Sequence, residues 1–172
     1  MSPLKRAPSG DMPMWERLVA SFFLIGEAAP FAPATFASLA FLPAIYFYQT
    51  VPLAAQLAAV AVVTFVGVIV STRAEPHYGH DGSAIVIDEV AGMLVTFVAV
   101  SRGVDGITDV WILLTGFLLF RIFDIWKPFP ANRAQNLPTG TGVMTDDLIA
   151  GLYANLVLQV IGRWAGWFPE AL

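Results

Sequence analysis

Cysteine is absent from this 172-residue chain, which excludes disulfides, thiolate metal sites and a cysteine nucleophile. Charge is scarce as well, since Asp, Glu, Lys and Arg together make up only 13% of the residues. Acidic residues outnumber basic ones by thirteen to nine, and no basic run exists that would neutralise a line of phosphates. We therefore expect no nucleic-acid partner. Two histidines are too few for a typical zinc centre.

Apolar residues dominate the chain. They make up 57% of it, against about 45–50% in ordinary soluble domains, and the mean hydropathy is +0.70. No charged residue or histidine occurs from 28 to 72, a run long enough for two membrane passes of about 20 residues each. The composition predicts a membrane protein. Lys5, Arg6 and Arg17 favour a cytoplasmic N-terminus, because basic residues gather on that side.

Proline and glycine divide the chain into six expected helices, at about 14–28, 35–49, 53–73, 87–101, 108–126 and 144–163. The first two either span the membrane, enter and leave it on the same side, or lie at its surface. Thr108 or Asp109 is the expected cap of 108–126, and Thr141 or Thr145 that of the last helix. Residues 1–13 are expected to form a flexible tail and 14–172 a single membrane domain. The predicted fold class is all-α, a multi-helical membrane-embedded bundle of five to six helices with polar loops, at 73–83 and 128–142, forming the site.

Acidic residues gather at the polar ends of three of these apolar helices. A charge at the centre of a membrane helix costs about 2.5–3.5 kcal/mol, so such groups face one another, a metal, water or a charged substrate. Carboxylate oxygens suit Mg²⁺ better than Zn²⁺. Taken singly, an acid in a first helical turn also complements the helix dipole. Together they predict a Mg²⁺ site made from Asp88, Glu89, Asp124, Asp146 and Asp147.

Basic residues accompany these acids at the end of helix 108–126. Arg121 and Asp124 share a face, and Lys127 follows by one turn. A guanidinium offers a planar fork that fits a phosphate, and a lysine adds a mobile charge. The alternative is a structural Arg121–Asp124 pair, with Lys127 reaching toward lipid headgroups. The segment TGTG at 139–142 presents backbone N–H groups that would suit an anion, and His80 is a candidate general acid or metal ligand.

Two of the acidic helices contain a similar short pattern. DEVAGML at 88–94 and DDLIAGLY at 146–153 both place an acidic pair one turn before Ala-Gly. Asp88 and Gly92, like Asp147 and Gly151, are four residues apart and share a helix face. Glycine at such a position lets a neighbouring backbone approach closely. Chance is the competing explanation, because the pattern is short.

Three motifs resemble one known family in matching order. IDEVAGM at 87–93, FRIFDIWKPFP at 120–130 and GTGVMTDDLIAG at 140–151 are similar to those of phosphatidylglycerophosphatase A, a bacterial inner-membrane lipid phosphatase. HDGS at 80–83 and PFAPATFASL at 30–39 also resemble elements of that family. Ala34, Ala37 and Thr139 stand where the family pattern has glycine, and Ile87 where it has tryptophan. All the central acidic and basic positions are retained.

The resemblance implies Mg²⁺-dependent hydrolysis of phosphatidylglycerophosphate to phosphatidylglycerol and phosphate, at the cytoplasmic face of a bacterial inner membrane. The five acids would hold one or two Mg²⁺ ions, and direct attack by water is preferred over a covalent intermediate. The expected catalytic residues are Asp88, Asp124, Asp147 and His80. The expected substrate-binding residues are Arg121, Lys127, Thr35, Ser38 and Gly142.

A small ion- or proton-coupled carrier is the alternative function, with the Asp/Arg cluster as a relay. A carrier would place its charges at mid-helix and break its helices near the bilayer centre. In this chain the acids cluster at helix ends, beside polar loops. The pattern therefore favours the enzyme.

Overall fold

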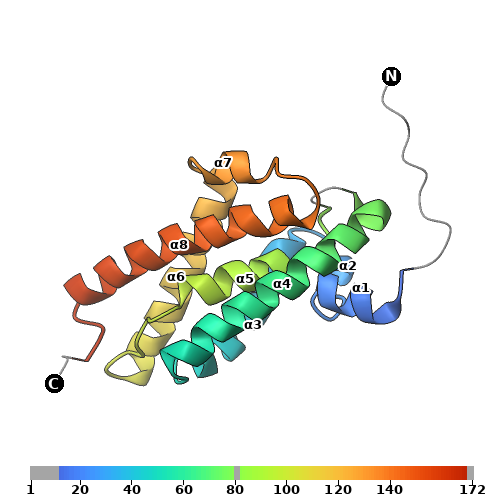
Figure 1. The fold of residues 1–172 in the computed structure, drawn as a ribbon. Helices are drawn as coiled ribbons and strands as arrows, with labels where there is room; N and C mark the ends of the chain where they lie inside the picture. The colour runs from blue at the N-terminus through green and yellow to red at the C-terminus, as the bar shows by residue number, and fades with distance from the viewer. Residues whose placement is uncertain (1–11, 80–81, 170–172) are drawn as a thin grey trace.

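All regular elements are helices in the residues that the structure, a computed structural model, describes, namely 12–79 and 82–169. The predicted all-α class is confirmed. Three helices, α4, α6 and α8, are long and apolar enough to cross a membrane, and α3 is a shorter apolar helix. The helices shown in Figure 1 are α1 (Met14–Ala20), α2 (Ile25–Ala28), α3 (Pro33–Tyr48), α4 (Leu53–Tyr78), α5 (Ile87–Thr96), α6 (Gly106–Trp126), α7 (Ala131–Ala134) and α8 (Gly140–Trp164).

The first predicted helix, 14–28, is wrong as a single element. Phe22, Phe23 and Leu24 have left-handed backbone with φ between 45° and 67°, which separates α1 from α2. Two hydrogen bonds hold this break: Leu24 N–H donates to Ser21 Oγ at 3.1 Å, and Val86 N–H donates to the Ala20 carbonyl at 2.8 Å. The loop before α5 therefore uses a carbonyl that the next helical turn would have used.

The predicted helix caps are also wrong. Asp105 caps α6, since its carboxylate accepts from Thr108 N–H at 2.7 Å, and Asp109 lies inside the helix. Helix α8 begins at Gly140, so that both Thr141 and Thr145 lie within it. The Thr145 hydroxyl donates to the Thr141 carbonyl at 2.6 Å, as helical threonines often do.

Helix α5 lies at the centre of the bundle, packed against α3, α4, α6 and α8 (Figure 1). Nine of its ten residues are buried. It ends at Thr96, whereas the sequence predicted a helix as far as 101. Amide side chains from two neighbours bind the backbone where it unwinds: Gln56 on α4 accepts from Ala99 N–H, and Asn155 on α8 donates to the Thr96 carbonyl. These partners stabilise a break that apolar surroundings would otherwise disfavour.

Helices α5 and α8 meet at the two glycines of the repeated sequence pattern. A Cβ on Gly151 would lie 2.4 Å from the Gly92 carbonyl oxygen, a separation that real side chains do not tolerate. The expectation that glycine permits a close backbone approach here is confirmed. This contact lies one turn from Asp88 and one turn from Asp147, so it brings the acidic ends of the two helices together.

The outward faces of the long helices are apolar. Exposed residues include Leu57, Val62 and Phe65 on α4, Leu118 and Ile122 on α6, and Leu156 and Val160 on α8. Such faces suit a lipid environment better than water. The buried core lies behind them in two clusters, one around Phe97 and Phe120 and the other around Val70 and Met144.

Candidate active site

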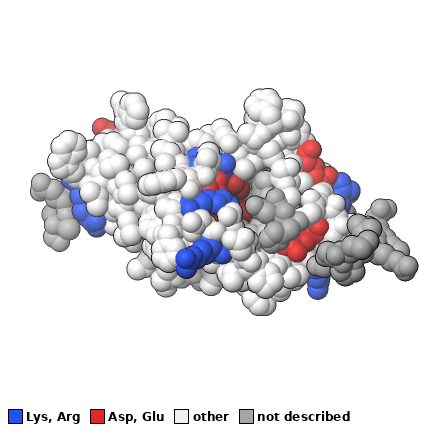
Figure 2. Space-filling view, turned by 90° about the horizontal axis from the view of Figure 1, so that it is seen from above, with Lys and Arg blue, Asp and Glu red and all other residues white. Residues whose placement is uncertain are grey.

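A polar cavity of about 260 Å³ opens where one end of the bundle brings four helices together. Its walls come from the starts of α3, α5 and α8, from the end of α6, and from the loop before α5. Acidic side chains gather in a hollow with basic side chains beside them (Figure 2). The charged residues that line the cavity are Asp88, Glu89, Asp124, Asp147, Arg121 and Lys127.

Three carboxylates converge in this cavity. Glu89, Asp124 and Asp147 are buried, and each offers one oxygen within 4.8 Å of the other two. Oxygens at such spacing need move little to share an ion, since Mg²⁺ binds oxygen at about 2.0–2.1 Å. Asp147 Oδ2 is buried without a hydrogen-bond partner in the described part of the chain, which is unusual for a carboxylate oxygen. The donor set and this unused oxygen fit a divalent cation.

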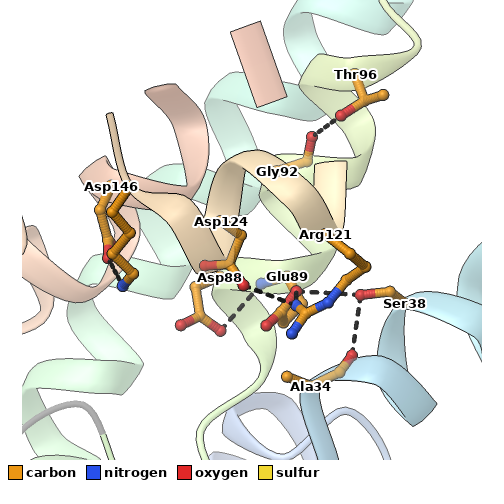
Figure 3. Close-up of polar contacts among 10 residues, drawn as sticks. Ala34, Ser38, Asp88, Glu89, Gly92, Thr96, Arg121, Asp124 and Asp146 are labelled. Carbon is orange, nitrogen blue, oxygen red and sulfur yellow. Dashed lines mark hydrogen bonds and ion pairs between the residues drawn. The ribbon is translucent and has the colours of Figure 1, made fainter. Parts of the chain in front are cut away.

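Arg121 lies between two of these acids. Its Nη1 donates to Glu89 Oε2 at 2.6 Å and lies 3.0 Å from Asp124 Oδ2 (Figure 3). Its buried Nε has no hydrogen-bond partner among the described residues. Both readings of Arg121 from the sequence are thus compatible with the geometry: the structural pair with Asp124 is present, and a donor remains for a ligand.

Lys127 and Asp146 form an ion pair beside the acidic cluster. Lys127 ends α6 in a left-handed conformation, with φ of 46°, and lines the cavity. Burial alone would lower the pKa of Lys127, but the hydrogen bond and charge of Asp146 raise it above its ordinary value. The lysine therefore stays protonated near neutral pH. Asp146 is engaged by Lys127, whereas Asp147 points into the cluster.

Negative charge is in excess at this end of the bundle. Five carboxylates accompany two cations, Arg121 and Lys127, in and beside the cavity. Burial raises the pKa of the Glu89 carboxyl to about 7, while the charge of Arg121 acts in the opposite direction and that of Asp124 adds to the rise. Burial is the main cause of this rise. A divalent cation bound in the cavity would offset the excess of carboxylate charge.

Ser38 lies behind Glu89 rather than on the cavity wall. It is fully buried, and its hydroxyl reaches Glu89 Oε2 at 3.1 Å and the Ala34 carbonyl at 2.9 Å (Figure 3). One hydroxyl proton serves these two acceptors in turn. In this geometry Ser38 orients Glu89. Thr35 is half-buried and does not line the cavity, whose wall on α3 is made by Pro33 and Ala34.

The TGTG segment is used by the protein itself. Gly140 N–H donates to the Thr72 hydroxyl at 3.0 Å, and Gly142 N–H donates to the Thr139 carbonyl at 3.0 Å. Gly142 is buried, and a Cβ there would lie 2.4 Å from the Leu137 carbonyl oxygen. Its glycine is explained by this packing. His80, the predicted general acid, lies outside the described residues.

Sequence reasoning missed two kinds of residue. Pro33, Ala34 and Ile125 line the cavity but carry no chemical signal in their residue type. Asn155 is the second kind, because its residue type did carry a signal. A polar amide inside an apolar helix is uncommon, and when buried it usually has a specific hydrogen-bond partner.

Comparison with known proteins identifies relatives over most of the chain. A family model described as phosphatidylglycerophosphatase A matches residues 18–162. A protein of Bacteroides thetaiotaomicron, named as a candidate phosphatidylinositol-3-phosphatase, is 38% identical over 79% of this chain and 86% of its own length. Phosphatidylglycerophosphatase A of Escherichia coli is 34% identical over 78% of this chain and 77% of its own. The Haemophilus influenzae phosphatidylglycerophosphatase A is 40% identical over about half of each chain. No solved structure matches.

Proposed function

The chain belongs to the phosphatidylglycerophosphatase A family and is a phosphatase of this kind, and on that premise we propose that it hydrolyses phosphatidylglycerophosphate with the aid of Mg²⁺. The products would be phosphatidylglycerol and inorganic phosphate. The observation that carries the proposal is the convergence of Glu89, Asp124 and Asp147 beside Arg121 and Lys127 in one cavity. Carboxylates to hold a metal and cations to bind a phosphate are the two components that such hydrolysis requires.

Glu89, Asp124 and Asp147 would hold the metal, with Asp88 at the edge of the same cavity. When bound, Mg²⁺ would lower the pKa of the attacking water and neutralise charge on the phosphoryl oxygens. Arg121 would donate from its unused Nε to one phosphate oxygen. Lys127 would leave Asp146 and donate to a second phosphate oxygen. Hydrolysis forms a bond from water oxygen to phosphorus and breaks the bond from phosphorus to the glycerol oxygen, which leaves with a proton. His80 remains a candidate for the donor of that proton.

We place the site at the cytoplasmic face of a bacterial inner membrane. The bundle end that holds the cavity carries Arg17, Arg73, Arg121, Lys127 and Arg133 among its described residues, whereas the opposite end carries Arg102 and Arg163. Basic residues favour the cytoplasmic side of a membrane. The acids lie at helix ends rather than at mid-span, so a lipid headgroup would meet them at the membrane surface. The same position argues against a carrier, whose relay would cross the bilayer centre.

A phosphorylated inositol lipid is the second candidate substrate, because the Bacteroides thetaiotaomicron relative is named for that headgroup. The two lipids share a phosphate monoester on a polar headgroup, and they differ in the size of the alcohol that leaves. The charged residues of the cavity would contact the phosphate and the metal, and these are common to both esters. The assay must therefore compare both.

The deciding experiment measures phosphate release from phosphatidylglycerophosphate and from phosphatidylinositol 3-phosphate by protein purified in detergent, with Mg²⁺ or with EDTA. We expect release only with Mg²⁺, faster from phosphatidylglycerophosphate, and reduced by about 100-fold or more in Asp124→Asn and Asp147→Asn. Asp109→Asn is the matched control, because Asp109 is a buried acid that pairs with Arg102 at the opposite end. Full activity in EDTA, or unchanged release by both site variants, would refute the metal assignment.

A further inference from the structure

Helices α5 and α8 face each other through three matched positions, which extend the sequence pattern of acid and glycine by one more turn. On α8, Asp147, Gly151 and Asn155 follow one another at four-residue intervals. On α5, Asp88, Gly92 and Thr96 do the same. Gly151 packs on the Gly92 carbonyl, and Asn155 binds the Thr96 carbonyl. The two helices thus contact each other at the glycines and at the amide, and the acidic residues lie one turn further along each helix.

Asn155 makes the side-chain hydrogen bonds between these matched positions of α5 and α8. Its side chain is buried, and its Nδ2 donates to the Thr96 carbonyl at 2.9 Å and to the Val98 carbonyl at 2.8 Å. Its Oδ1 accepts from Gln159 Nε2 at 2.9 Å, which holds the amide in the orientation that points both N–H groups at α5. All of its donors are used.

The two carbonyls that accept from Asn155 explain why this contact depends on the axial position of α5 along α8. Thr96 is the last residue of α5, and Val98 lies in the unwound segment after it. Carbonyls at a helix end have no partner within the helix, and inside an apolar bundle they must find one in a neighbour. Sliding α5 along α8 by one residue, about 1.5 Å, would break both hydrogen bonds. Asn155 therefore favours one axial register of the two helices.

We propose that Asn155 is a positioning residue that fixes the register of α5 on α8 and thereby sets the spacing of Glu89 and Asp147. It lies two turns, about 12 Å, from Asp147 on the same helix, so it touches neither metal nor substrate. The link is mechanical: α5 is a short helix whose first turn carries Glu89 and whose last carbonyl is held by Asn155. The inference rests on the proposed function for the statement that Glu89 and Asp147 share a metal.

Gln56 provides a matched control for a merely structural role. It too is a buried amide that binds the unwound segment, since its Oε1 accepts from Ala99 N–H at 2.8 Å. Its Nε2 donates to the carbonyls of Tyr48 and Val51. Gln56 lies on α4, however, and it does not tie α5 to α8. Loss of Gln56 should loosen the fold to a similar degree without shifting the carboxylates.

The test compares Asn155→Leu, Asn155→Ala and Gln56→Leu with the parent protein. The first readout is the dissociation constant for Mn²⁺ alone, measured by electron paramagnetic resonance without substrate. We expect it to rise by about tenfold or more in both Asn155 variants, as for other residues that orient metal ligands, and by less than about twofold in Gln56→Leu. Thermal unfolding in detergent identifies any variant that is not folded, and the second Asn155 variant then provides the comparison.

The second readout needs no metal and uses the absence of cysteine from the chain. A Glu89→Cys/Asp147→Cys pair should be cross-linked by a short bifunctional thiol reagent, since the carboxylate oxygens of the two residues lie within 4.8 Å. Adding Asn155→Leu should lower the cross-linking rate several-fold, and adding Gln56→Leu should not. Unchanged cross-linking and unchanged Mn²⁺ affinity in the Asn155 variants would overturn the inference, as would equal effects of Gln56→Leu. Parent protein that binds no Mn²⁺ would instead refute the proposed metal, while cross-linking still decides the register.

Discussion

Gly151→Ala should reduce activity more than it reduces stability. The added Cβ would lie 2.4 Å from the Gly92 carbonyl oxygen and 3.1 Å from Val95 Cβ. Ordinary contact begins at 3.4 Å, so the two backbones must separate by about 1 Å at this point. Asp147 lies one turn away on α8 and Glu89 about one turn away on α5, and most of that displacement therefore reaches the acidic cluster.

The magnitudes of the two effects differ. Misplacement of catalytic groups by about 1 Å can cost on the order of 100-fold in rate, which corresponds to about 2.7 kcal/mol in the barrier. For stability, overpacking costs roughly 1–3 kcal/mol, and the better helix propensity of alanine offsets about 1 kcal/mol of it. The net loss of unfolding free energy should thus be no more than about 2 kcal/mol.

The assay measures kcat for phosphate release together with the midpoint of thermal unfolding in the same detergent. Gly106→Ala is the matched control, because a Cβ on Gly106 would meet nothing within 4 Å. We expect the control to keep parental activity. A folded Gly151→Ala protein whose kcat stays within about threefold of the parent would show that the close approach of α5 and α8 does not position the carboxylates.

Two further predictions concern the arginine that we propose binds phosphate, Arg121, and the orientation in the membrane. Arg121→Lys keeps the charge but loses the planar guanidinium between Glu89 and Asp124, so KM for the lipid should rise by about tenfold or more. Steady-state kinetics at saturating Mg²⁺ measure this change. A KM equal to that of the parent protein would argue against phosphate binding by Arg121. Asn132→Cys in α7 and Ala165→Cys after α8 are exposed at opposite ends of the bundle. In intact cells an impermeant thiol reagent should label only Ala165→Cys, and labelling of Asn132→Cys instead would reverse the proposed orientation.

Much of the helical architecture follows from sequence because helix formation is local. Long apolar runs predicted α4, α6 and α8 to within a few residues at most ends, and proline or glycine marked most of their boundaries. The predicted helix boundaries were wrong where a residue distant in sequence hydrogen-bonds to the backbone. Val86 stabilises the break after α1, and Asn155 stabilises the early end of α5. Such partners are far away in sequence, so no local pattern indicates them.

The composition of the candidate site was also available from sequence, since acids and bases that are costly in apolar helices must meet a polar partner. All five predicted acids gather at one end of the bundle, and Arg121 and Lys127 lie with them. Roles that depend on the direction in which a side chain points were harder to predict from sequence. Ser38 lies behind Glu89, and Gly142 is explained by packing, although both stand in motifs that suggested contact with substrate.

The sequence by itself determined which residues bring charge into an apolar bundle and at which helix ends they lie. Only the tertiary structure decided what each of them faces. Adjacent residues of a helix point about 100° apart, so the paired acids Asp146 and Asp147 diverge to Lys127 and to the carboxylate cluster. Which acid takes which direction depends on the rotation and register of α5 and α8, and these are set by the contact of Gly92 with Gly151 and by the hydrogen bonds of Asn155.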